Sequence, residues 1–189
     1  IPRRSIVASA LAAPALPRFA KAAEFSMRLG HAAPESFPLH ARLKEAAEEV
    51  GRLSSGRVEI SVFPESQLGS QVGMLNQVRS GTLDATTIPG QSLQGVMGNA
   101  FVQMVGFAFK GYPELWSAMD GDVGAIMRNM FKERLGMFAM PKVFDFGFRH
   151  VSTGTKVIRE AFDIRDLKIR TPVDQDLIAL FRALGASPL

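Results

Sequence analysis

The spacing of hydrophobic and polar positions alternates between strand-like and helix-like segments along the first half of the chain. Alternation of apolar and polar residues predicts strands at 25–30, 58–62 and 83–88. Apolar stripes with helical spacing predict amphipathic helices at 38–53 and 71–79, each bounded by turn-forming residues. Strands that alternate with helices at this spacing are typical of a parallel sheet covered by helices.

The second half of the chain has a less regular pattern. Helical spacing predicts helices at 112–119 and 123–135, and a further helix at 177–184 that ends at Gly185. Residues 137–148 and 149–153 are predicted to form two strands, the first interrupted by a proline. A third short strand is predicted at 167–170, closed by Pro172. The fold class expected from both halves is α/β.

A cluster of phenylalanines and methionines lies between the two halves. We expect these side chains, together with Trp116, to form core rather than a pocket. They are Met97, Phe101, Met104, Phe107 and Phe109. The apolar run around them contains Gln103 and Gly106 and is too short to span a membrane.

The positive formal charge of +4 is confined to the first 22 residues. These hold Arg3, Arg4, Arg18 and Lys21 and no acid, so 22 − 4 = 18 bases face 18 acids in the rest. An apolar stretch and the small-residue site at 20–22 follow the arginine pair, which is the order of an export signal cleaved after Ala22. A disordered or amphipathic N-terminal arm is the alternative, and both the general and the twin-arginine export routes stay open.

The balance of charge and motifs argues against two classes of function. A net charge of zero after residue 22, with no basic stripe, disfavours nucleic-acid binding. No cysteine, no G-x-S-x-G and no H-E-x-x-H motif is present, and His31, His40 and His150 lie far apart in sequence, which disfavours an exported hydrolase. No cofactor or metal is expected.

Ligands of parallel α/β sheets bind at the carboxyl ends of the strands. For the first three predicted strands these ends are 31–33, 63–65 and 89–92. His31 and Gln91 are therefore candidate ligand-binding residues. The alternatives are that His31 only caps a helix or bonds backbone, and that Gln91 is solvated.

Several segments between residue 25 and the last residue together resemble the solute-binding family of TRAP (tripartite ATP-independent periplasmic) transporters. The most specific of them is Asp166-Leu167-Lys168-Ile169-Arg170-Thr171-Pro172. The others are Val58–Pro64 with Gln67-Leu68-Gly69, Gln77–Asp84 and Asp120–Gly124. The resemblance implies a two-lobed clamshell of mostly parallel sheets, with a first lobe at 23–147 and an incomplete second lobe at 148–189.

The same resemblance implies roles for two arginines. Arg170 matches the arginine that clamps a substrate carboxylate, for which a guanidinium offers two parallel donors. Arg149 matches a second arginine that contacts the ligand or completes the closed form. Spacing alone leaves another interpretation open, in which both arginines form surface pairs with Asp145, Asp166 or Asp174.

The function implied by the resemblance is capture of a small carboxylate-bearing organic acid in the periplasm. The protein would deliver this ligand to the small and large TRAP membrane subunits without being membrane-embedded itself. A binding protein of an ATP-driven importer, or of a sensing system, is the alternative. The family pattern continues past Leu189, so we expect further pocket residues there, and a dicarboxylate, keto acid, sugar acid or aromatic acid fits equally well.

Overall fold

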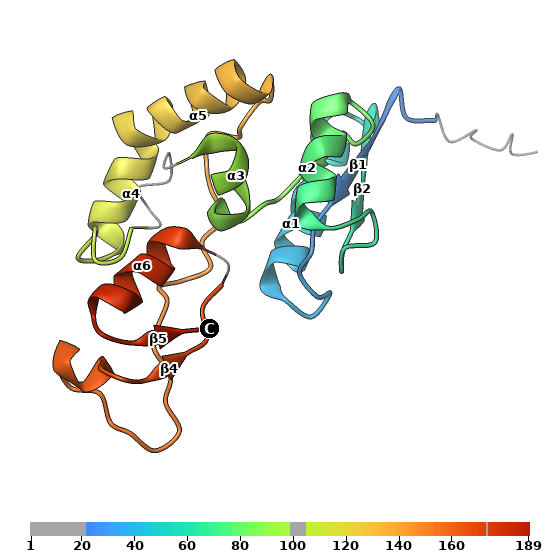
Figure 1. Cartoon of the computed structure of the whole chain (residues 1–189). Coiled ribbons are helices and arrows are strands. Elements are labelled where there is room, and N and C mark those ends of the chain that lie inside the picture. Colours follow the sequence, from blue (N-terminus) through green and yellow to red (C-terminus); the bar gives the residue numbers. More distant parts are fainter. Residues whose placement is uncertain (1–21, 99–104, 173) are drawn as a thin grey trace, which may run out of the picture.

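The computed structural model describes residues 22–98, 105–172 and 174–189, and its first part is a three-stranded parallel sheet. The strands are β1 (Phe25–Gly30), β2 (Val58–Phe63) and β3 (Ala85–Thr86), in the order β2-β1-β3. β1 pairs with β2 along its whole length and with β3 at its carboxyl end (Figure 1). The predicted parallel sheet is confirmed, although β3 is shorter than the alternation at 83–88 predicts.

Two helices connect these strands, and local sequence sets their ends. α1 (Pro38–Leu53) begins with a proline in its first turn and buries Leu39 and Leu43. α2 (Gln71–Ser80) begins where the Ser70 hydroxyl accepts a hydrogen bond from the Gly73 amide at 3.1 Å. It ends at Gly81, whose φ of 76° is the left-handed conformation that glycine adopts without strain. Both predicted helices are confirmed.

A helical region follows the sheet and contains much of the buried apolar surface. It consists of η1 (Gly90–Leu93), α3 (Gln94–Met97), α4 (Tyr112–Asp120) and α5 (Asp122–Leu135). The core cluster joins α2 to this region through Leu75, Leu93, Met97, Met119, Met127 and Leu135. Figure 1 shows α4 and α5 beside α3, on the far side of that short helix from the first sheet.

The expectation that the phenylalanine and methionine cluster forms core is confirmed for some members and wrong for one. Met97 is 1% exposed and Trp116 packs against the core cluster, as expected. Phe107 is 87% exposed, because it lies in an irregular loop with φ of 64° rather than on a helix face. Phe101 and Met104 lie outside the described residues, as does the export signal up to residue 21.

The last part of the chain forms a second, smaller parallel unit. It contains η3 (Ala161–Ile164), β4 (Lys168–Ile169), α6 (Gln175–Ala183) and β5 (Ser187–Pro188). β4 and β5 pair in parallel, with α6 as the crossover between them. The predicted strand at 167–170 and the predicted last helix are confirmed, while β5 was not predicted.

The two strands predicted at 137–148 and 149–153 are wrong. Residues 137–159 have no regular secondary structure, and residues 140–157 are exposed throughout. Neither sheet of the described chain offers this segment a pairing partner, so its backbone groups face solvent instead of a neighbouring strand. The predicted boundary between lobes, at residues 147 and 148, falls within this segment and stays a prediction.

The joint between α4 and α5 depends on the absence of a side chain at Gly124. A Cβ there would lie 1.8 Å from the Met119 carbonyl oxygen and 2.7 Å from its carbonyl carbon, both backbone atoms. We expect Gly124→Ala to lower the free energy of unfolding by roughly 1–3 kcal/mol, since the backbone must shift. Chemical denaturation of the full-length protein measures this change.

Gly95→Ala is the matched control, because a Cβ at Gly95 meets no atom within 4 Å. In a helix this substitution is expected to be neutral or to stabilise by up to about 1 kcal/mol. Equal effects of the two substitutions would contradict the proposed close approach of the α4–α5 joint.

Candidate functional site

The strand order creates one position in the first sheet where a ligand site is expected. The chain passes from β1 to β2 on one side of β1 and then to β3 on its other side. An open parallel sheet is expected to bind ligands in a crevice at the carboxyl ends of the two strands where the connections change direction, which here are β1 and β3. His31 follows β1 directly, and Gln91 lies in η1, the short helix after β3, so both residues follow strands that end at this edge.

His31 is fully buried at that edge, with 0% exposure. Its backbone amide donates to the Phe63 carbonyl at 2.9 Å, and its carbonyl accepts from the Ser66 amide at 3.0 Å. On the side chain, Nε2 lies 3.0 Å from Nδ1 of His40 in α1, while Nδ1 of His31 has no hydrogen-bond partner. The described contacts of the His31 side chain are therefore with His40 and not with backbone or a helix end, and one ring nitrogen is unpaired.

Burial lowers the pKa of the His31 imidazole below its ordinary value, and the positive charge that His40 can carry lowers the pKa further. A neutral ring at this position is a hydrogen-bonding group rather than a cation. Its unpaired Nδ1 is costly in a buried setting unless a further group bonds to it. This makes the nitrogen a candidate contact for a ligand.

Gln91 lies half-buried in η1, the short helix after β3. Its neighbour Ser92 donates a hydrogen bond to Gln71 Oε1 at 2.6 Å, which ties η1 to the start of α2. The turn after β3 is also fixed to β1, because the Thr87 amide and the Thr86 hydroxyl both donate to the Gly30 carbonyl. Gln91 is therefore held on an ordered element beside the strand that carries His31.

Arg170 lies at the carboxyl end of β4, the corresponding edge of the second sheet. Its side chain is exposed, and within the described part of the chain it forms no ion pair. The next residue, Thr171, is 7% exposed, donates its amide to the Leu189 carbonyl at 3.1 Å, and has a hydroxyl without a hydrogen-bond partner. A free guanidinium thus adjoins a buried, unpaired hydroxyl.

Arg149 lies in the extended segment that replaces the predicted strands. Aromatic contacts hold the residues before it: Phe148 packs on Tyr112 with centroids 4.7 Å apart, and Phe146 stacks on Phe37 at 5.3 Å. The guanidinium is exposed and forms no ion pair with the described acids. No contact in the structure brings Arg149 to Arg170, His31 or Gln91.

The alternative of surface pairs with nearby acids is not what the structure shows. The Asp145 carboxylate accepts from the Gly147 amide at 2.8 Å. Asp174 is 2% exposed and accepts the Asp176 and Leu177 amides at the start of α6. Among the described residues, neither Arg149 nor Arg170 forms an ion pair with Asp145, Asp166 or Asp174.

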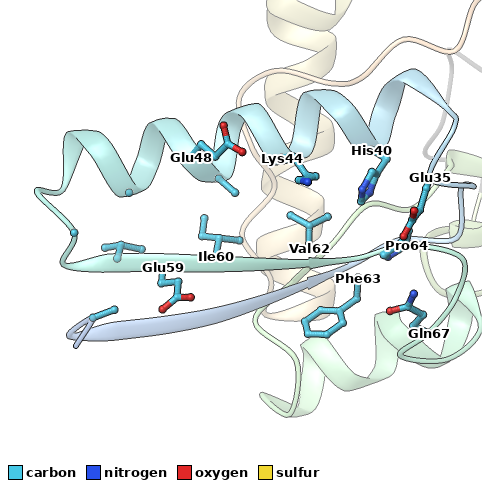
Figure 2. A pocket seen from close by; sticks show the side chains of 15 residues that line it. Glu35, His40, Lys44, Glu48, Glu59, Ile60, Val62, Phe63, Pro64 and Gln67 are labelled. Atoms are coloured by element: carbon cyan, nitrogen blue, oxygen red, sulfur yellow. The ribbon is translucent and has the colours of Figure 1, made fainter. Parts of the chain in front are cut away.

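An open groove of about 730 Å³ runs between α1 and the free edge of β2. Figure 2 shows His40 and Lys44 on the α1 side, with Glu35, Pro64 and Gln67 at the end of the groove near the carboxyl end of β2. None of the four predicted site residues lines it. His40 connects the two places, since it lines the groove and contacts His31 at the crevice.

Sequence reasoning missed His40 and Thr171. His40 is nine residues from His31, and their contact depends on how α1 packs against β2 beside β1, which spacing alone does not reveal. Thr171 stood next to the arginine in the most specific segment of the resemblance, and a threonine directly after a strand was the available signal.

Within the described residues no cluster suited to a metal ion is found, and no helix there is long and apolar enough to cross a membrane.

Comparison with known proteins places this architecture among binding proteins. The family model for bacterial extracellular solute-binding proteins, family 7, matches residues 29–189. A solute-binding protein of Roseobacter denitrificans is 31% identical over 167 residues, which are 88% of this chain and 50% of that protein. The chain spans about half the length of the curated relatives it matches.

Solved structures agree with the family model. A TRAP periplasmic solute-binding protein from Sulfurospirillum deleyianum, with bound succinate, has a TM-score of 0.75 at 27% identity, over 88% of this chain and 53% of that one. The Roseobacter denitrificans protein with bound L-galactonate has a TM-score of 0.67 at 27% identity, over 89% and 55%. The predicted fold class, a two-lobed α/β architecture with parallel sheets, is confirmed by these neighbours.

The buried His31 predicts how stability depends on pH. Because its pKa is lower in the folded than in the unfolded protein, the unfolded chain binds more protons as the pH falls through about 6.5. Stability is therefore fully present above that pH and decreases below it. We expect the melting temperature to fall between about pH 7.5 and about pH 5, and to fall less in His31→Asn, which cannot titrate.

Differential scanning calorimetry of both proteins in matched buffers measures this difference. His150 is exposed, so His150→Asn serves as the control and should keep the wild-type pH dependence. An unchanged slope in His31→Asn would contradict the assignment of acid sensitivity to the buried ring.

Proposed function

The chain belongs to family 7 of the bacterial extracellular solute-binding proteins, the TRAP solute-binding family, and we propose that it binds a small organic acid through the carboxylate. Arg170 is the residue that anchors the carboxylate in this proposal. The observation that carries it is the position of a guanidinium without an ion pair at the carboxyl end of β4, directly before a buried hydroxyl without a partner.

The chemistry of this position suits a carboxylate. A guanidinium presents two parallel N–H donors that match two carboxylate oxygens, and burial of such a pair on ligand binding strengthens both hydrogen bonds. The neighbouring Thr171 hydroxyl can donate one more. On the first sheet, His31 and Gln91 add neutral hydrogen-bonding groups that suit the uncharged part of the same ligand.

The relatives support a carboxylate ligand without identifying it. Succinate and L-galactonate are bound in the two solved structures described above. The 2,3-diketo-L-gulonate-binding periplasmic protein of Escherichia coli is 25% identical over 164 residues, which are 87% of this chain and 49% of that protein. These ligands differ in size and hydroxylation but share a carboxylate, which is the group that Arg170 would hold.

The remaining parts of the proposal concern location and partners. The protein would act in the periplasm after export directed by residues 1–22. Closure of the two lobes over the ligand would bury the arginine–carboxylate pair and create the surface that the small and large TRAP membrane subunits recognise. Catalysis is not part of this proposal, because the family consists of solute-binding proteins.

A thermal-shift panel of organic acids on the full-length protein tests the proposal. The panel contains succinate, D-galacturonate, L-galactonate, pyruvate and benzoate. A ligand at about a hundred times its dissociation constant adds roughly 2.7 kcal/mol to the stability of the folded state, which raises the melting temperature measurably. We expect one class of acid to give this rise and Arg170→Ala to abolish it.

The size of the Arg170→Ala effect follows from leaving a carboxylate without its partner. Such truncations cost roughly 2–5 kcal/mol, a loss of affinity of about 30-fold to a few thousand-fold by calorimetry. Arg182→Ala is the matched control, an exposed arginine at the end of α6, and should leave binding unchanged. Failure of every acid to bind the wild type would overturn the proposed function.

Arg149→Ala tests the second arginine separately. We expect a smaller loss of affinity than for Arg170→Ala, because Arg149 lies on an extended segment instead of a strand end and must be ordered on binding. Calorimetry on the single and double variants measures it. Strictly additive losses would argue against the two arginines holding the same carboxylate, since groups that share a partner couple.

A further inference from the structure

His31 and His40 form a hydrogen-bonded pair in which only one ring is buried completely. Nε2 of His31 and Nδ1 of His40 are 3.0 Å apart, and the ring centroids are 5.3 Å apart. His31 is 0% exposed, whereas His40 is half-buried and lines the open groove along β2 (Figure 2). One nitrogen of the contact must donate and the other must accept.

This contact sets the tautomer of His31. If His40 donates from Nδ1, then Nε2 of His31 is the acceptor and its proton must be on Nδ1. If His31 donates from Nε2, its Nδ1 carries no proton and can only accept. Whether the unpaired Nδ1 of His31 is a donor or an acceptor therefore depends on which ring donates in the contact with His40.

Protonation of His40 fixes which of the two rings donates the hydrogen bond. An imidazolium has protons on both nitrogens, so a protonated His40 can only donate to His31, which is then held in the Nδ1–H tautomer. Burial lowers the pKa of His31, which disfavours a proton on that ring, and His40 is the ring of the pair that lines the open groove. Acidification thus converts Nδ1 of His31 into an obligatory donor.

The charged groups around the pair come from three elements. Lys44 lies one turn after His40 in α1, Glu35 precedes α1, and both line the same groove. Glu65 lies in the turn after β2 and donates its amide to the Ala33 carbonyl. The strand β2 contributes the apolar Phe63 and Pro64 at this end of the groove, and α2 contributes Met74 beside Gly30.

We propose that His40 is a positioning residue that makes ligand binding proton-dependent, by forcing His31 to offer an Nδ1–H donor to an oxygen atom of the bound acid. This inference rests on the proposed function, because it assumes that the acid reaches the crevice at β1 and β3. It adds a residue and a form of regulation to that site. By linkage, a proton that favours binding must itself be bound more tightly when the ligand is present.

The ligand-free half of the test observes the tautomer directly. Full-length protein labelled with ¹⁵N at histidine is titrated, and two-bond ¹H–¹⁵N correlations show which nitrogen of His31 carries the proton. We expect the Nδ1–H form to dominate once His40 is protonated, with exposed His150 as an internal reference. A His31 ring that keeps its proton on Nε2 at acid pH overturns the inference, whatever is known of binding.

The ligand half of the test uses D-galacturonate, whose single carboxylate stays ionised over the range used. We expect its affinity to rise as the pH falls from about 7.5 to about 5.5, by at most about tenfold per unit for one linked proton. His40→Leu removes the donor and should abolish this rise. His40→Asn keeps an amide donor near the position of Nδ1 and should restore binding with no dependence on pH.

The outcomes separate this inference from the proposed function. No thermal shift with any acid of the panel overturns the proposed function, and the inference with it. Binding of an acid with the same affinity at both pH values, in wild type and His40→Leu alike, overturns only the inference. The inference is supported if the pH dependence of the affinity disappears in both His40→Leu and His40→Asn, and if the titration shows the Nδ1–H form of His31.

Discussion

The pairing of β1 between β2 and β3 fixes the position of the candidate site residues in the first sheet. β1 is the central strand: it pairs with β2 along its whole length and with β3 only at Leu29 and Gly30, so its carboxyl end is the part that is paired on both sides. The connections change direction between β1 and β3, and the carboxyl ends of these strands are where a parallel sheet is expected to bind a ligand. The residue at that end, His31, is buried by the turns around it and yet has an unpaired nitrogen. The position of the candidate site thus follows from the strand order, and its hydrogen-bonding chemistry follows from the His31 side chain.

A strand needs a neighbouring strand as its hydrogen-bonding partner, and this explains why the segment predicted as strands at 137–153 does not fold as one. Residues 143–151 have strong β propensity and alternate large apolar residues with polar or small ones, as a half-buried strand does. In the structure the segment is extended and exposed, and aromatic contacts at Phe146 and Phe148 fix it instead of hydrogen bonds. Propensity describes how well a sequence suits a pleated surface and does not supply the neighbouring strand. Arg149 therefore lies on a support that is less rigid than the strand end that carries Arg170.

Local patterns predicted most elements, whereas contacts between distant elements were beyond them. The periods of α1, α2, β1 and β2 were strong, and caps such as Ser70 and Gly81 confirm why those helices begin and end where they do. The short strand β5 has no such signal, because two residues cannot show a period. For the site, strand ends identified His31 and Gln91 as candidates and the family resemblance identified Arg170 and Arg149, and the roles of all four are still predictions. The partner of His31 depends on how α1 packs against β2, which no local pattern encodes.

The division of charge between the two sheets has a physical reason. A cation at the buried end of β1 would lose its hydration without a fixed counter-charge, so burial keeps the His31 ring neutral. Arg170, in contrast, lies on an exposed strand end, where its charge stays hydrated until a ligand arrives. Under the proposed function, the charged contact would attract the acid while the lobes are open. The neutral groups of the first sheet would form their hydrogen bonds as water leaves, and would discriminate among acids that the arginine alone would accept.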